Sequence, residues 1–173
     1  MATVWTMLRL LTVLMLFATS VEAQTPVPRA TGELKTVLCA ARAISDCDRA
    51  EFAPPQPIDV NGDGEREWLF VLLRGGPDLC HVRHACFAIV QRAGPTWMVL
   101  LSGMGGSVGF SRAPAANPAR FRDLIVVAAN SADEHEHILY RWRSSVYRQV
   151  RRQPCGLDDR SGLCTLVGEL ILQ

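Results

Sequence analysis

From residue 68 onward the chain consists of short apolar runs, and their length limits the folds that it can adopt. The runs lie at 68–73, 86–91, 97–101, 121–129, 138–142, 146–150 and 165–172. Each is too short for an ordinary helix, and short polar turns separate most of them. Parallel pairing would need long crossover connections between successive strands. The pattern therefore predicts an antiparallel β-meander of about six to seven strands.

An amphipathic segment precedes these runs. Thr31 can cap a helix in which apolar residues recur at helical spacing. These residues are Leu34, Val37, Leu38, Ala41 and Ile44. Prolines at 54, 55 and 57 then favour an extended backbone. We expect an α+β fold, with the N-terminal helix packed on or beside the antiparallel sheet.

The N-terminus has the pattern of a secretory signal peptide. An apolar run at 10–18 follows Arg9, and Val21-Glu22-Ala23 is typical of a cleavage site. The run is too short for a membrane span, which needs about 20 residues. We predict a cleaved signal peptide at 1–23, a linker at 24–30 and one globular domain at 31–173, periplasmic or extracellular and without a membrane span after cleavage. An uncleaved amphipathic anchor is the alternative.

Six cysteines follow the predicted signal peptide. An even number of cysteines in an exported chain indicates disulfides rather than free thiols. They occur as three local couples, and each couple brackets a turn-like segment. We predict the pairs Cys39–Cys47, Cys80–Cys86 and Cys155–Cys164. His81 and His84 lie inside the second couple, which would indicate zinc in a reducing compartment but a disulfide in an exported protein.

Residues 59–67 read D-V-N-G-D-G-E-R-E, a spacing of oxygen-bearing side chains that suits a hard cation. Glycines at 62 and 64 allow the backbone to curl. The candidate ligands are the side chains of Asp59, Asn61, Asp63 and Glu67 and the backbone carbonyl of Glu65. All are oxygens and the segment has no His or Cys, so the expected ion is calcium. A tight Asx-rich turn without an ion is the alternative.

This loop does not continue as an EF-hand. An EF-hand places a bidentate Glu at position 12 and a helix on each side, whereas position 12 here is Phe70 and the run at 68–73 is typical of a strand. The loop resembles the loop-then-strand calcium site of integrin-type FG-GAP repeats, D-x-[DN]-x-D-G-x-x-[DE]. One loop is too few for a propeller of such repeats.

The chain also looks similar to small exported bacterial proteins of unassigned function that carry one FG-GAP-type loop. The further matching residues are Gly94-Pro95-Thr96-Trp97, Asp123-Leu124, Trp142 and Tyr147. The resemblance implies a structural calcium ion that stiffens the entry to a strand.

Two other patterns suggest chemistry. Residues 105–109 read G-G-S-V-G and fit the nucleophile elbow of serine hydrolases, with Ser107 as nucleophile and His135 or His137 as base. An elbow needs a helix after the serine, and Pro114 and Pro118 oppose one. The glycines more simply describe a flexible hairpin loop. His135 and His137 would share one face of a strand and suit zinc, although a solvated strand start is the simpler interpretation.

The charge balance gives no reason to expect nucleic-acid binding, because the chain has 18 basic and 17 acidic residues. One basic cluster could contact an envelope protein or a polyanion. Its members are Arg141, Arg143, Arg148, Arg151 and Arg152. We expect a non-enzymatic exported domain with a structural calcium loop, acting in envelope binding, inhibition or structural support. A small secreted serine hydrolase is the alternative.

Overall fold

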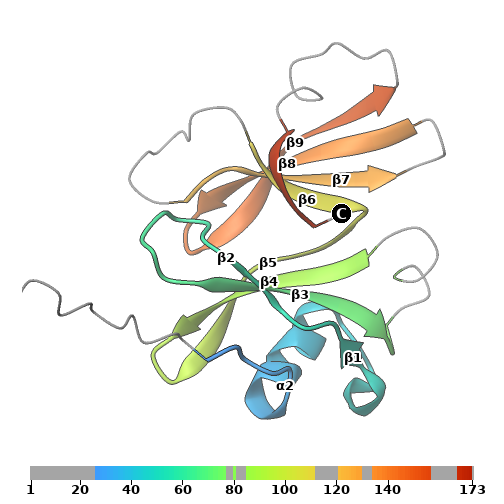
Figure 1. Ribbon diagram of the computed structural model, residues 1–173. Coiled ribbons are helices and arrows are strands. Elements are labelled where there is room, and N and C mark those ends of the chain that lie inside the picture. The colour runs from blue at the N-terminus through green and yellow to red at the C-terminus, as the bar shows by residue number, and fades with distance from the viewer. Residues whose placement is uncertain are drawn as a thin grey trace, which may run out of the picture.

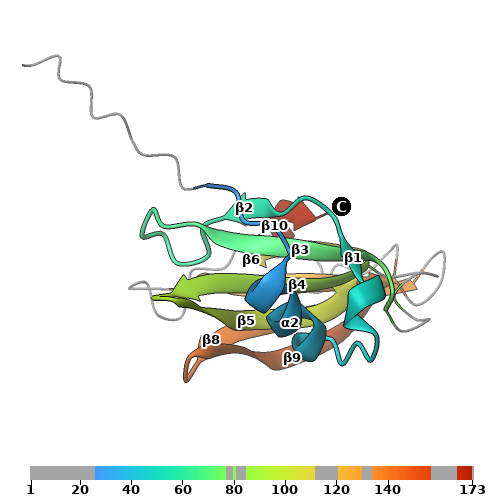
Figure 2. The same ribbon diagram turned by 90° about the horizontal axis from the view of Figure 1, so that it is seen from below.

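The computed structural model describes residues 26–76, 80, 85–111, 121–129, 134–156 and 167–172. The elements form three layers, in which α2 (Gly32–Ala41) covers one face of a first sheet and a second sheet covers the other face (Figure 1). The view from below places α2 in front of the first sheet (Figure 2).

The two sheets are both antiparallel and five-stranded. The first contains β1 (Glu51–Phe52), β2 (Gln56–Ile58), β3 (Glu67–Arg74), β4 (Ala85–Ala93) and β5 (Thr96–Gly105), in the order β1-β3-β4-β5 with β2 also paired to β3. The second contains β6 (Ser107–Ser111), β7 (Leu124–Ala129), β8 (Glu134–Arg143), β9 (Val146–Gly156) and β10 (Val167–Leu172), in the order β10-β6-β7-β8-β9. A 3-10 turn, η2 (Cys47–Arg49), follows the helix.

The predicted helix and antiparallel sheet are confirmed, but the predicted number of strands is wrong. The glycine-rich segment 105–109, interpreted above as a hairpin loop, carries the chain from β5 into β6 of the other sheet. A Cβ on Gly105 would lie 2.6 Å from Val126 Cγ1 and 3.0 Å from the Val127 carbonyl oxygen. Glycine is therefore needed because the two backbones approach closely, and strand β6 follows at once.

Strands β1 and β2 were also missed, because each is too short for an alternating pattern to be visible. β2 contains Pro57 and β1 is followed by Pro54 and Pro55. Proline lacks the backbone N–H of a ladder and is confined to sheet edges. Among the described strands, β1 and β2 each pair only with β3. One side of each strand therefore has no ladder partner and tolerates proline.

The helix is shorter than expected. It ends at Ala41 instead of reaching Ile44, whose backbone N–H donates to the Cys39 carbonyl at 2.9 Å. Thr31 occupies the N-cap position, but its side chain makes no capping hydrogen bond. Leu34 and Leu38 are buried against the sheet.

Strand β3 is buried on both faces, which explains its unbroken apolar run. Trp68 and Phe70 pack with the helix, whereas Leu69 faces the second sheet. The core between the sheets is the largest apolar cluster of the described part. Its buried members are Ile58, Val60, Leu69, Phe87, Ile89, Leu100, Leu101, Val108, Phe110, Leu124, Val126, Ile138 and Tyr147.

Two of the predicted disulfides, Cys39–Cys47 and Cys80–Cys86, are present. Their sulfurs lie in one buried cluster with Leu72 at the end of the helix. The third predicted pair includes Cys164, which lies outside the described residues, as do His81 and His84.

The predicted signal peptide at 1–23 also lies outside the described ranges. Among the residues that are described, no helix is both long and apolar enough to cross a membrane.

Leu38→Ala should destabilise the protein by about 2–5 kcal/mol, because the Leu38 side chain is fully buried between α2 and the first sheet and its truncation leaves a cavity. Thr36→Ala, on the exposed face of the same helix, should change stability by about 0.5 kcal/mol or less. Urea denaturation of both variants measures the difference. Equal stabilities would contradict the packing of α2 on the first sheet.

Candidate calcium loop and its junction with the second sheet

The candidate loop, residues 59–66, connects β2 to β3. The register pairs Ile58 with Glu67, so the loop begins and ends at neighbouring positions of the ladder. Gly62 and Gly64 have φ angles of +73° and +82°, a region that side chains disfavour. An added Cβ at either glycine would have no atom within 4 Å. These glycines are therefore required by the backbone conformation and not by lack of space.

Three of the predicted ligand side chains hold the loop in this shape. Asp59 accepts the Gly62 N–H through Oδ1 at 2.6 Å and the Gly64 N–H through Oδ2 at 3.2 Å. Asp63 Oδ1 accepts the Glu65 N–H at 2.7 Å, and its Oδ2 accepts from Asn61 Nδ2 at 2.6 Å. Asn61 Oδ1 in turn accepts the Asp63 N–H at 3.0 Å. The loop thus curls around oxygen atoms supplied by Asp59, Asn61 and Asp63.

Glu67, the last predicted ligand, is completely buried. Its Oε2 accepts the Val60 N–H at 2.8 Å, but its buried Oε1 has no hydrogen-bond partner in the described part of the protein. Burial is the main cause that raises the pKa of Glu67 to about 7, and the charges of Asp63 and Asp59 contribute to this rise. The carboxylate therefore lies within electrostatic reach of both loop aspartates.

The arrangement is not a closed metal cage. Within the described residues, no group of three or more Asp, Glu, His or Cys side chains is positioned to hold a metal ion. The hydrogen bonds above direct the Asp59 and Asp63 carboxylates toward backbone N–H groups. A carboxylate has about four acceptor sites, so these bonds do not exhaust its capacity. Glu65 has an exposed side chain.

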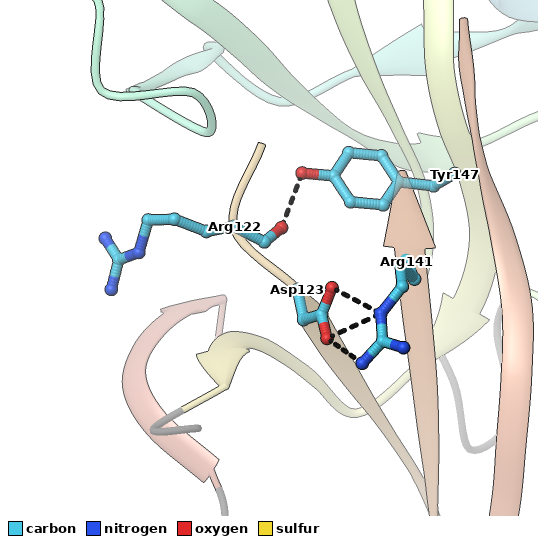
Figure 3. Close-up of polar contacts among 4 residues, drawn as sticks. All are labelled: Arg122, Asp123, Arg141 and Tyr147. Atoms are coloured by element: carbon cyan, nitrogen blue, oxygen red, sulfur yellow. Dashed lines mark hydrogen bonds and ion pairs between the residues drawn. The ribbon is translucent and has the colours of Figure 1, made fainter. Parts of the chain in front are cut away.

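The segment 121–123, called the strap below, joins the loop to the second sheet through hydrogen bonds. The Arg122 N–H donates to the Val60 carbonyl at 2.7 Å, and the Arg122 carbonyl accepts from Tyr147 Oη at 2.8 Å. Figure 3 shows the Tyr147 hydroxyl directed at the Arg122 carbonyl, while the Arg122 side chain points away. Burial raises the pKa of Tyr147, and the charge of Glu67 adds to this effect. These contacts thus form one polar junction within the core, made of Glu67, Val60, Arg122 and Tyr147.

The next residue anchors the same strap. Asp123 is 3% exposed and accepts hydrogen bonds from Nε and Nη2 of Arg141, the shortest at 2.8 Å (Figure 3). This bonding raises the pKa of Arg141. The sequence analysis did not predict the Arg122–Tyr147 hydrogen bond or the Asp123–Arg141 ion pair. Arg122 and Tyr147 are distant in sequence from the loop, and no local spacing indicates their contacts.

The residues of the hydrolase alternative do not form a catalytic pair. Ser107 begins strand β6 instead of preceding a helix, and both Ser107 and His137 pair with Val127 on opposite sides of β7. Two strand spacings separate their backbones, about 10 Å. His135 and His137 share a face as predicted, with ring centroids 5.0 Å apart. They belong to no metal-binding group within the described residues.

The predicted basic cluster is partly neutralised by its own neighbours. Arg141 pairs with Asp123, and Arg152 pairs with Glu136 at 2.8 Å. The register places Arg141 opposite Arg148, whereas Arg152 pairs with Ile138 on the other face. Arg151 bonds Gln153, and Arg143 and Arg148 are exposed. A polyanion or envelope partner for this surface stays a prediction.

Comparison of the chain with protein-family models, curated proteins and solved structures finds no match. The resemblance to FG-GAP-type loops therefore stays a prediction from the loop residues alone.

Without calcium, the stability of the protein should fall as the pH rises from about 5 to about 7. The pKa of Glu67 is raised from 4.5 to about 7 in the folded state, so folding binds a proton that is lost across this window. Ionising the buried carboxylate should cost about 2–3 kcal/mol by pH 8. Glu67→Gln cannot ionise and should remove that loss, measured by urea denaturation in EGTA at pH 5 and pH 8.

The exposed Glu33 gives the matched control, and Glu33→Gln should keep the pH dependence of the unmodified protein. Equal pH dependence in Glu67→Gln and the unmodified protein would show that Glu67 does not carry this effect.

Proposed function

We propose that this is an exported, non-enzymatic domain in which loop 59–67 binds one calcium ion as a structural element. The ion would be held by the side chains of Asp59, Asn61, Asp63 and Glu67 and by the backbone carbonyl of Glu65. It supplies positive charge at the entry to β3, where the loop meets the core between the two sheets.

The unpartnered Oε1 of Glu67 is the observation that carries this proposal. A buried carboxylate is costly unless it is protonated or compensated by positive charge. No basic side chain pairs with Glu67 within the described residues, and two aspartates add negative charge nearby. A hard cation bound by oxygen ligands would compensate all three carboxylates at once. The strap then links the loop to β9 through Val60, Arg122 and Tyr147.

The proposed role of the ion is to hold the two sheets in one arrangement, and the proposed role of the domain is envelope binding, inhibition or structural support. Two disulfides and a core shared by both sheets support a rigid domain of this kind. Exposed loops on such a rigid framework commonly carry binding residues.

Calcium at about 10 mM should raise the Tm by roughly 3–8 °C at pH 7.5, because an extracellular site with a Kd of about 0.1–1 mM stabilises only the folded state. Asp63→Ala should abolish the increase, since it removes both a ligand and the Asx turn. Differential scanning calorimetry in calcium and in EGTA measures the shift, and isothermal titration calorimetry measures binding directly.

Two further variants make this experiment specific. Glu65→Gln should keep the calcium shift, because the proposed ligand at this position is a backbone carbonyl. Glu67→Gln should lose it while remaining folded, since the neutral amide stabilises the apo protein at this pH. A protein whose Tm and titration heat do not respond to 10 mM calcium, a concentration at least about tenfold above such a Kd, would refute the proposal.

A further inference from the structure

Loop 59–66 and the β4–β5 turn lie at the same end of the first sheet (Figure 1). Residues of this loop, of β4 and of β5 line a concave pocket of about 630 Å³. Its volume falls within the range of about 300–1,000 Å³ that is usual for small-molecule sites. Trp97, which is partly exposed, gives it an apolar floor on the helix side of the sheet, with only the edge of the buried Trp68 beside it, and the segment Pro26–Pro28 forms a wall. Arg66 and Arg92 line the same pocket.

Arg92 is held in a fixed orientation. Its Cζ lies 5.5 Å from the ring centroid of Trp97, and its Nε donates to the Gly94 carbonyl at 3.1 Å. These contacts leave its two terminal amino groups without a partner in the described part of the chain. A guanidinium that presents these groups as a fork matches the geometry of a carboxylate.

Arg66 adds a second positive charge beside the first. The ladder of β3 and β4 ends at the pair Trp68 and Val90, and Arg66 and Arg92 each lie two residues beyond this pair. Two like charges that line one pocket repel each other. Neither arginine forms an ion pair within the residues that the structure describes, although Glu65 also lines the pocket. An anion between the two guanidinium groups would remove the repulsion.

We infer that this pocket binds a small organic carboxylate. The carboxylate lies between Arg66 and Arg92, and the apolar body of the molecule packs against the two tryptophans and the proline wall. The apolar lining distinguishes this ligand from an inorganic anion, which would gain nothing from Trp68 and the prolines. The inference goes beyond the calcium proposal and does not depend on it, so the test is made in EGTA.

The test compares two probes that share a naphthalene ring, 2-naphthoate with a carboxylate and 2-naphthylmethanol with a neutral hydroxymethyl group, by isothermal titration calorimetry. Naphthoate should bind the unmodified protein at least about tenfold more tightly than the alcohol, because only the acid offers two anionic oxygens to the guanidinium groups. Arg92→Gln and Arg66→Gln should each weaken naphthoate binding by about tenfold and leave alcohol binding unchanged. Arg92→Lys should lose part of the affinity, since lysine keeps the charge but not the fork.

Arg74→Gln is the matched control, because Arg74 is an exposed arginine at the far end of β3 and does not line the pocket. This variant should bind naphthoate like the unmodified protein. Circular dichroism of each variant confirms folding before titration. Equal affinity for the two probes, no binding of naphthoate, or unchanged binding in Arg92→Gln would overturn the inference.

Discussion

Glu67 places a carboxylate in the core where loop 59–66, strand β3 and the strap at 121–123 meet. Its Oε2 holds the Val60 N–H, and the Val60 carbonyl accepts the Arg122 N–H. Tyr147 then reaches the Arg122 carbonyl from strand β9. One buried acid therefore fixes the loop end, and the bonds that follow from it connect the first sheet to the second. A charge on this acid is costly at this position, because Oε1 is buried and no basic side chain among the described residues reaches it.

The calcium proposal follows because a negative charge on Glu67 is unfavourable at this buried position. A proton can neutralise Glu67 at low pH, and a cation can neutralise it together with Asp59 and Asp63 at higher pH. In either case the architecture requires the carboxylate to be compensated. The loop is thus better understood as part of the packing between the sheets than as an isolated surface turn. In the neighbouring pocket, Arg66 comes from the end of the same loop, whereas Arg92 comes from β4.

Much of the fold could be predicted because the signals are local. Apolar runs of strand length, the helical spacing after Thr31 and the cysteine couples each involve residues close in sequence. The runs at 68–73 and 97–101, for example, lie within β3 and β5. The prediction failed at 105–109, where glycines usually indicate flexibility. Here Gly105 lacks a side chain because Val126 and Val127 approach its backbone. That requirement comes from a strand about twenty residues away, and no local pattern contains it.

The sequence by itself determined the antiparallel strands, the two local disulfides and a loop whose glycines and Asx side chains dictate its curl. These features depend on interactions across a few residues, which spacing reveals. Only the tertiary structure decided that Glu67 is buried with no partner for Oε1 among the described residues, and that Arg122 and Tyr147 connect the loop to the second sheet. It alone placed Arg66 and Arg92 around one pocket with two tryptophans. Burial and electrostatic environment arise from residues far apart in the chain, so they exist only once the two sheets and the helix have packed.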